Sequence, residues 1–103
     1  MAKRQRLAEC SEIPLGKSKV VYLDDEREIA LFHLAEGSFY ALNNLCPHRE
    51  GPLGEGKLDG AIITCPWHGW EFDVRTGEST NMAGECTETI AIEVDGGTIY
   101  LSE

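Results

Sequence analysis

Short runs of β-branched and aromatic residues, each bounded by glycine or aspartate, recur about every ten residues along this chain. In the run 89–94, isoleucine and valine alternate with Ala91 and Glu93, as in a half-buried strand. Helical periodicity is limited to a single turn near residues 8–13. A length of 103 residues allows one modest core. The sequence therefore predicts one all-β domain over 1–103, an antiparallel sandwich or barrel, with strands at 19–23, 28–34, 38–42, 60–64, 70–74, 89–94 and 98–102.

The chain is strongly acidic, with 18 Asp and Glu against 9 Lys and Arg and a formal net charge of −9. This charge argues against nucleic acid and against an anionic membrane surface as partners, because both require a basic face. No Lys or Arg follows Arg75, so the C-terminal part carries only negative charge. Two interpretations remain open: docking to a basic patch on another protein, or a charge that only keeps the protein soluble.

Neither a secretory signal nor a membrane-spanning segment is predicted, because the chain has no apolar run of sufficient length. We therefore expect a cytoplasmic protein. Four cysteines are too few for a disulfide scaffold, and in a reducing compartment they indicate metal or redox chemistry. Cys10 and Cys86 are expected to be free thiols, with a disulfide between them as the alternative.

One region interrupts the strand pattern: residues 43–57, NNLCPHREGPLGEGK, form a long irregular loop of the kind that carries function. It contains Cys46 and His48, and sixteen residues separate His48 from a second pair, Cys65 and His68. Two Cys and two His could hold one zinc ion in a tetrahedron. Each arm is mixed, however, with one thiolate and one imidazole. Mixed arms better suit a [2Fe-2S] cluster in which one iron takes both Cys and the other takes both His.

The neighbouring residues also fit a cluster. Glycines would let the backbone approach closely and point N–H groups at sulfur. Large apolar side chains would form a wall of low dielectric constant. The glycines are Gly51, Gly54, Gly56 and Gly69, and the wall residues are Leu45, Leu53, Trp67, Trp70 and Phe72.

The segment CPH, followed sixteen residues later by CPWHGWEFD, resembles the Rieske iron–sulfur motif Cys-x-His…Cys-x-x-His. The resemblance extends over about residues 8–101 and implies the Rieske fold, three stacked antiparallel sheets with a cluster-binding part at about 43–75. It further implies one Rieske [2Fe-2S] cluster, with Cys46 and Cys65 on the buried iron and His48 and His68 on the outer iron.

The chain also departs from parts of the family. Respiratory and photosynthetic members carry a disulfide between the two loops, where this chain has Gly51 and Trp67. They also place Ser and Tyr hydroxyls near sulfur, where this chain has Trp70 and Phe72. Fewer donors to sulfur predict a reduction potential toward the low end of the Rieske range, about −150 to +300 mV. The third covering loop, here STNMAGEC, lacks the proline that is common in the family.

Two further polar residues are expected to be structural. His33 ends an apolar run and is expected to be a structural or surface histidine. Asp73 is expected to form a turn rather than act as a catalyst. With His33 excluded, no mononuclear iron triad can be assembled, and the chain has no dinucleotide or flavin fingerprint.

The chain is therefore expected to be an electron-transfer protein rather than an enzyme. The resemblance implies a soluble Rieske-type ferredoxin that passes electrons from a flavin-containing NAD(P)H reductase to a terminal oxygenase. One alternative is the small subunit of an assimilatory nitrite reductase, which resembles the same domain. Another, of a different class, is a zinc-stabilised interaction module without redox function.

Overall fold

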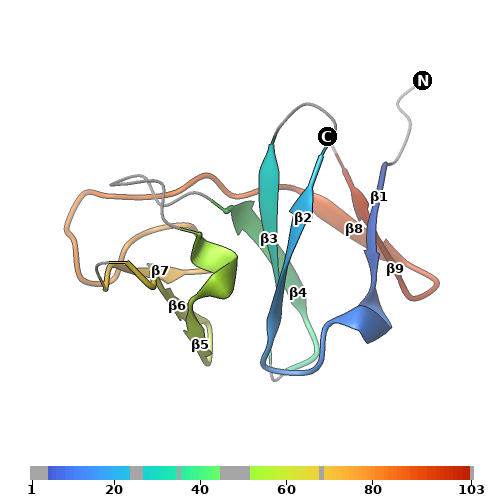
Figure 1. Ribbon diagram of the computed structural model, residues 1–103, viewed down its shortest axis with the longest axis horizontal. Helices are drawn as coiled ribbons and strands as arrows, with labels where there is room; N and C mark the ends of the chain where they lie inside the picture. Colours follow the sequence, from blue (N-terminus) through green and yellow to red (C-terminus); the bar gives the residue numbers. More distant parts are fainter. Residues whose placement is uncertain (1–4, 24–26, 35, 45–51, 68, 103) are drawn as a thin grey trace.

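A computed structural model describes residues 5–23, 27–34, 36–44, 52–67 and 69–102. Three antiparallel sheets of three strands each lie side by side (Figure 1). The middle sheet has the order β2 (Ser18–Tyr22), β3 (Glu28–His33), β4 (Phe39–Asn43). Because both faces of this sheet are covered, β3 is apolar on both sides: Ile29 and Leu31 join one core, and Ala30 and Phe32 join the other.

The first outer sheet has the order β1 (Gln5–Glu9), β9 (Thr98–Leu101), β8 (Ile92–Asp95). It packs on the Ile29 and Leu31 face of the middle sheet through Leu7, Ile99 and Leu101. A short 3-10 helix, η1 (Cys10–Glu12), follows β1 and brings Ile13 into the same core.

The second outer sheet has the order β5 (Lys57–Asp59), β6 (Ile62–Thr64), β7 (Glu71–Asp73). The 3-10 helix η2 (Leu53–Glu55) precedes it and contacts β2, β3 and β6. Leu53, Ile63 and Phe72 are fully buried against Phe32 of the middle sheet. Cys65, one of the predicted ligands, belongs to this second core.

The predicted all-β class and three stacked sheets are confirmed, and each of the seven predicted strands has a counterpart. Two strands escaped prediction. β1 reads QRLAE and has only two buried residues. β5 is three residues long and begins at Lys57, the last residue of the segment assigned to the irregular loop. The predicted run 89–94 divides: Ile90 N–H donates to Ala41 O at the edge of β4, and β8 begins only at Ile92.

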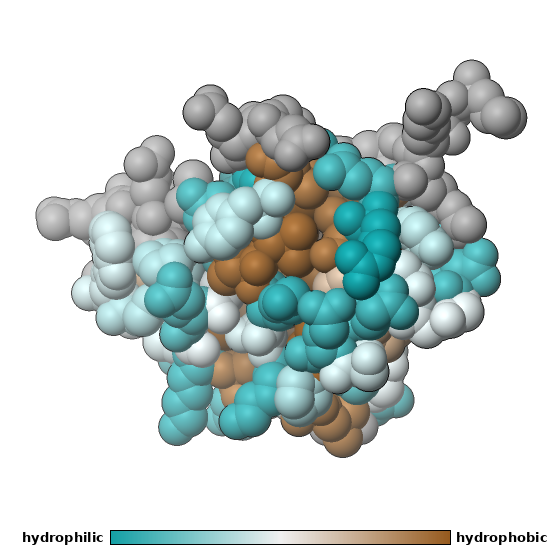
Figure 2. Space-filling view, turned by 45° about the vertical axis from the view of Figure 1, so that its right-hand side comes forward, coloured by the Kyte–Doolittle hydropathy of each residue, from teal (hydrophilic) through white to brown (hydrophobic). Residues whose placement is uncertain are grey.

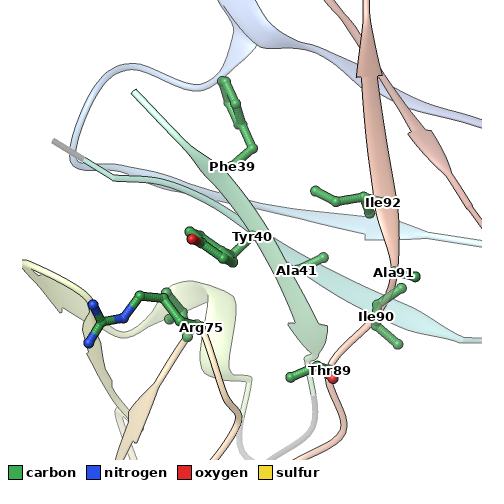
Figure 3. Close-up of a pocket in the computed structure, with 9 residues that line it drawn as sticks. Phe39, Tyr40, Ala41, Arg75, Thr89, Ile90, Ala91 and Ile92 are labelled. Atoms are coloured by element: carbon green, nitrogen blue, oxygen red, sulfur yellow. The ribbon is translucent and has the colours of Figure 1, made fainter. Parts of the chain in front are cut away.

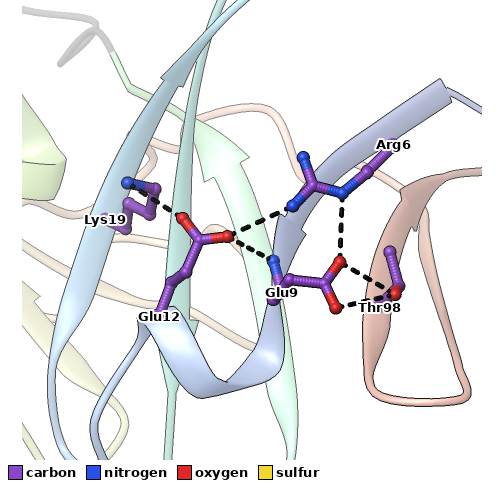
Figure 4. Close-up of polar contacts among 5 residues, drawn as sticks. All are labelled: Arg6, Glu9, Glu12, Lys19 and Thr98. Carbon is purple, nitrogen blue, oxygen red and sulfur yellow. Dashed lines mark hydrogen bonds and ion pairs between the residues drawn. The ribbon is translucent and has the colours of Figure 1, made fainter.

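A polar network closes one side of the two sheets that enclose the first core (Figure 4). Arg6 on β1 contacts Glu9 at 3.0 Å and Glu12 at 3.4 Å, and Lys19 on β2 contacts Glu12 at 3.5 Å. Thr98 on β9 donates its hydroxyl to Glu9 at 2.9 Å. The Glu12 carboxylate accepts a hydrogen bond from the Glu9 backbone N–H, and this bond is the largest cause of the lowered pKa of Glu12. The charged side chains of this network are 39–56% exposed, so their ion pairs order the surface more than they stabilise the fold.

The surface is mixed rather than uniformly charged. On the face in Figure 2, hydrophilic side chains surround an apolar area. The exposed large apolar side chains include Leu15, Tyr22 and Val94. No helix in the described ranges is long and apolar enough to cross a bilayer.

Candidate metal centre

The second predicted ligand pair is carried by the β6–β7 hairpin. Cys65 follows the last residue of β6, and its N–H donates to Trp70 O at 2.8 Å. Gly69 N–H returns to Cys65 O at 3.1 Å, and Gly69 has a positive φ of 75°, which glycine adopts without strain. The chain between Cys65 and Trp70 is therefore a four-residue hairpin loop, 66–69, that contains His68 in the sequence.

Cys65 is 1% exposed and belongs to the core formed by Leu53, Ile63 and Phe72. A buried thiol amid apolar side chains is a soft ligand in a dry, rigid setting, which suits iron–sulfur coordination. The described part of the predicted donor set therefore fits a cluster. Cys46, His48 and His68 lie outside the described residues, so their assignment as ligands stays a prediction.

The first predicted ligand pair lies in the segment 45–51, whose two ends are held together by Asn44. Leu53 N–H donates to Asn44 O at 2.6 Å, and Gly54 N–H donates to Asn44 Oδ1 at 2.6 Å. The Asn44 side chain also donates to Glu28 Oε1 at 2.9 Å. Asn44 is 1% exposed, so a buried amide closes the base of this loop from β4 to η2.

The bases of the two loops contact one another. The Cα of Gly56 lies so close to Thr64, the residue before Cys65, that a Cβ added there would overlap the Thr64 carbonyl oxygen. Only glycine, which has no Cβ, lets the two backbones pack this closely at the point where the first loop returns beside β6. This contact brings the described ends of both loops to one end of the second outer sheet.

Two sequence-based expectations about the surroundings are wrong. The N–H groups of Gly54, Gly56 and Gly69 donate to Asn44 Oδ1, Leu53 O and Cys65 O, not to sulfur. These glycines serve turns and close packing. Trp67 is 63% exposed and is not part of an apolar wall.

The rest of the wall prediction is confirmed where the structure describes it. Leu53 and Phe72 are fully buried, and Trp70 packs partly buried beside them, with its ring 6.4 Å from that of Phe72. Gly51 and Leu45 lie outside the described residues.

The third loop pairs with the outer edge of β7. Asp73 N–H donates to Glu78 O, and Thr80 N–H donates to Glu71 O, both at 2.9 Å. The loop then turns and pairs with itself, since Ser79 N–H donates to Glu85 O at 2.9 Å. No proline is needed for this shape, because main-chain pairing to β7 fixes the loop.

Two asparagines at the loops were not singled out from the sequence. The first is Asn44, at the base of the 45–51 segment. The second is Asn81 in the third loop, whose side chain contacts both Gly69 and Glu71. Asn44 lies in the segment 43–57 that was assigned to the irregular loop, two residues before Cys46. Neither asparagine belongs to the metal motif, so the motif gave no signal for them.

Asp73 and Arg75 form a turn, as expected for Asp73. Asp73 accepts from Arg75 N at 2.9 Å and from Arg75 Nε at 3.0 Å, and Gly77 N–H donates to Asp73 O at 2.7 Å. The hydrogen bond from the Arg75 side chain is the largest cause that holds the pKa of Asp73 below its ordinary value.

The remaining candidates are structural as well. Nδ1 of His33 lies 2.8 Å from Ile13 O, and the His33 ring stacks on Phe39 with centroids 4.1 Å apart. These contacts confirm a structural histidine. Cys10 and Cys86 form no disulfide, as predicted.

A groove of about 350 Å³ lies between β4, the Arg75 turn and the 89–92 segment (Figure 3). The side chains of Tyr40 and Arg75 lie on one side of it. Cys65, the predicted ligand that the structure describes, is not among the residues that line this groove.

Comparison with known proteins gives a consistent family. A family model for the Rieske [2Fe-2S] domain matches residues 3–92. The 3-phenylpropionate/cinnamic acid dioxygenase ferredoxin subunit of Escherichia coli (strain K12) is 32% identical over 98 residues, which cover 93% of this chain and 92% of that protein. The alkene monooxygenase system ferredoxin component of Xanthobacter autotrophicus is 38% identical over 68 residues, 64% of this chain. The chain spans 55% of that protein and 15% of a 4beta-methylsterol monooxygenase from Methylococcus capsulatus.

Solved structures agree on the fold. The Sphingomonas yanoikuyae B1 ferredoxin has a TM-score of 0.89 at 26% identity, covering 98% of this chain and 99% of that chain. A ferredoxin in a complex of reduced oxygenase and oxidised ferredoxin of carbazole 1,9a-dioxygenase has a TM-score of 0.86 at 28% identity, covering 94% and 99%. A protein assigned as an NADH-dependent nitrite reductase small subunit from Mycobacterium tuberculosis has a TM-score of 0.86 at 20% identity, covering 98% and 95%, which supports the fold alone.

Proposed function

The chain belongs to the Rieske [2Fe-2S] domain family, and we propose that it is a one-electron carrier rather than an enzyme. We further propose that a single domain, 1–103, holds the cluster in its part at about 43–75, through Cys46, His48, Cys65 and His68. The observation that carries this proposal is the burial of Cys65 in the core, where it directly follows β6. The base of the first loop packs beside this position, through the contact of Gly56 with Thr64.

When bound, a Rieske cluster supplies reversible one-electron reduction. The role of the protein is to hold the ligands still and exclude water from the sulfur side. Leu53, Ile63 and Phe72 are fully buried around Cys65 and fill that side. Since protein interiors are close-packed, such a base limits rearrangement between redox states.

A spectrum tests the proposal directly. Protein purified without oxygen is expected to be red-brown and to give, when reduced, an EPR signal of lower average g than all-cysteine [2Fe-2S] clusters. Cys65→Ser and His68→Gln should lose this signal, whereas Cys86→Ser and His33→Gln should keep it, because the last two residues lie outside the proposed ligand set. A colourless protein with one zinc ion would overturn the proposal and favour the zinc-stabilised module.

We propose a flavin-containing NAD(P)H reductase as electron donor and a terminal oxygenase as acceptor, working in the cytoplasm. The ferredoxin relatives and the carbazole dioxygenase complex support an oxygenase as acceptor. The charge supports partners with basic patches, because Glu78 and Glu85 are exposed on the loop beside the β6–β7 hairpin. Opposite charges on the partners would steer these encounters.

Ionic strength tests the steering. Turnover with the reductase should slow as salt rises, and Glu78→Gln with Glu85→Gln should weaken that dependence. Glu93→Gln with Asp95→Asn, on β8 in the opposite outer sheet, is the matched control, because it also removes two negative charges. A salt-independent rate would contradict steering while leaving the cluster assignment intact.

The alternative is a small subunit of an assimilatory nitrite reductase, because a solved chain assigned as a nitrite reductase small subunit shares the fold. Purification distinguishes the two. A tight, stoichiometric complex with a large subunit would support the alternative. A monomer that reduces a separate oxygenase would support the ferredoxin.

A further inference from the structure

We propose that Asn81 is a positioning residue that fixes the His68-bearing hairpin loop for the cluster. The inference rests on the proposed function. It concerns a residue of the third loop that lies thirteen positions after His68 in the chain. Its side-chain amide contacts the hairpin at two points: Nδ2 donates to Gly69 O at 3.0 Å, and Oδ1 accepts from Glu71 N at 2.9 Å.

The two bonds extend a β ladder past its end. Main-chain pairing of the third loop with β7 runs from Glu78, bonded to Asp73, to Thr80, whose N–H donates to Glu71 O. At that point the third loop turns away. The side-chain amide of Asn81 then substitutes for the main chain. Its oxygen accepts from Glu71 N–H and its nitrogen donates to Gly69 O, as the next backbone groups of a ladder would.

Only a short carboxamide can do this. The orientation of the amide is set by its partners, because Glu71 N–H can only donate and Gly69 O can only accept. An aspartate would keep the acceptor but lose the donor and place a negative oxygen against Gly69 O. An alanine would lose both bonds, and with them the link between the third loop and Gly69.

Asn81 is itself held in place. Ser79 Oγ donates to Asn81 Oδ1 at 3.3 Å and accepts from Met82 N at 3.0 Å. Glu85 N–H donates to Met82 O at 3.1 Å, which closes the turn. The amide therefore projects from a closed turn whose arms are paired with β7 and with each other.

The consequence for the site follows from the chain. Gly69 is joined directly to His68, and its N–H is already bonded to Cys65 O. The Gly69 carbonyl accepts from Asn81, so both backbone polar groups of Gly69 are hydrogen-bonded. The residue that directly follows the histidine is therefore held in place on both sides. We expect this to fix the orientation of the His68 imidazole toward iron.

Three variants test the inference in the reduced holoprotein. Asn81→Ala and Asn81→Asp remove the donor to Gly69. Thr80→Val is the matched control, because it removes only the Thr80 Oγ1 bond to the Glu71 carboxylate, at 3.2 Å, and keeps the amide contacts. The readouts are the histidine nitrogen hyperfine couplings, the midpoint potential and the rate of cluster release to an iron chelator.

Asn81→Asp should release the cluster about two- to tenfold faster, the factor expected for loss of one hydrogen bond. Asn81→Ala loses both bonds and should release the cluster at least as fast. Both variants should also shift or broaden the nitrogen couplings, while Thr80→Val stays at wild-type values. Couplings, potential and release rate equal to those of Thr80→Val would overturn the inference. Faster release that only follows a lower unfolding midpoint, with unchanged couplings, would overturn it as well. Wild-type protein without histidine couplings would instead refute the proposed function, so the two failures are distinguishable.

Discussion

Replacement of Asn44 by alanine is expected to open the base of the 45–51 segment. The change removes the acceptor of Gly54 N–H, now 2.6 Å from Asn44 Oδ1, and the donor to Glu28. Gly54 is buried, and a buried donor left unsatisfied costs about 1–3 kcal/mol. Glu28 is only partly buried, so water can replace its lost partner, and we assign the main cost to Gly54. By the usual conversion, 1–3 kcal/mol is about a 5- to 150-fold change in the opening equilibrium.

Amide hydrogen exchange followed by mass spectrometry measures this opening directly. The peptide that contains Leu53 and Gly54 should exchange about 5- to 150-fold faster in Asn44→Ala than in wild type. Glu28→Gln is the matched control, because the amide keeps an acceptor for Asn44 Nδ2 while the Gly54 bond is untouched. Wild-type exchange in Asn44→Ala would refute the reasoning, and so would an equal acceleration in Glu28→Gln.

Two other substitutions follow from the same geometry. Gly56→Ala should lower the thermal unfolding midpoint more than Gly60→Ala, because the new Cβ would overlap Thr64 O and destabilise the fold by about 1–3 kcal/mol. At Gly60, which has a φ of 61° and open space around it, alanine should destabilise the fold by about 1 kcal/mol. Equal midpoints would contradict this. Arg75→Gln should destabilise the protein at neutral pH and less so in acid. The pKa of Asp73 is lowered, so the ionised carboxyl stabilises the fold above its ordinary pKa of about 3.9. This contribution is lost as pH falls through the folded pKa. Urea unfolding at pH 7 and at about pH 3 measures the difference, which should shrink at the lower pH.

The strand pattern predicted most of the fold because the middle sheet is covered on both faces. The run 28–34 is apolar at consecutive positions, and β3 buries Ile29 and Leu31 on one side and Ala30 and Phe32 on the other. β1 has no such pattern, since only Leu7 and Ala8 are buried in it. β1 is held by pairing with β9, a long-range contact that local composition does not encode.

The structure describes one of the four predicted ligands. Cys65 directly follows β6 and lies in the core, while the ligand roles of all four residues stay a prediction. The glycines were expected to bring the backbone close to the metal site. Instead Gly56 approaches the Thr64 backbone, and the N–H groups of Gly54 and Gly69 donate to Asn44 Oδ1 and Cys65 O. Composition indicates that a backbone can come close. It does not identify the atom that it approaches.

The main chain of each predicted ligand loop is expected to have few hydrogen-bond partners, which explains why side chains hold the loop ends. A short loop has few main-chain partners, and Pro47 and Pro66, one in each motif, remove a donor from each. In each case an asparagine outside the metal motif supplies an acceptor and a donor: Asn44 to Gly54 and Glu28, and Asn81 to Glu71 and Gly69. The predicted ligands and the asparagines that hold the ends of the two loops therefore lie at different positions. A chain with the same four ligands but without these amides should still assemble a cluster, yet release it faster.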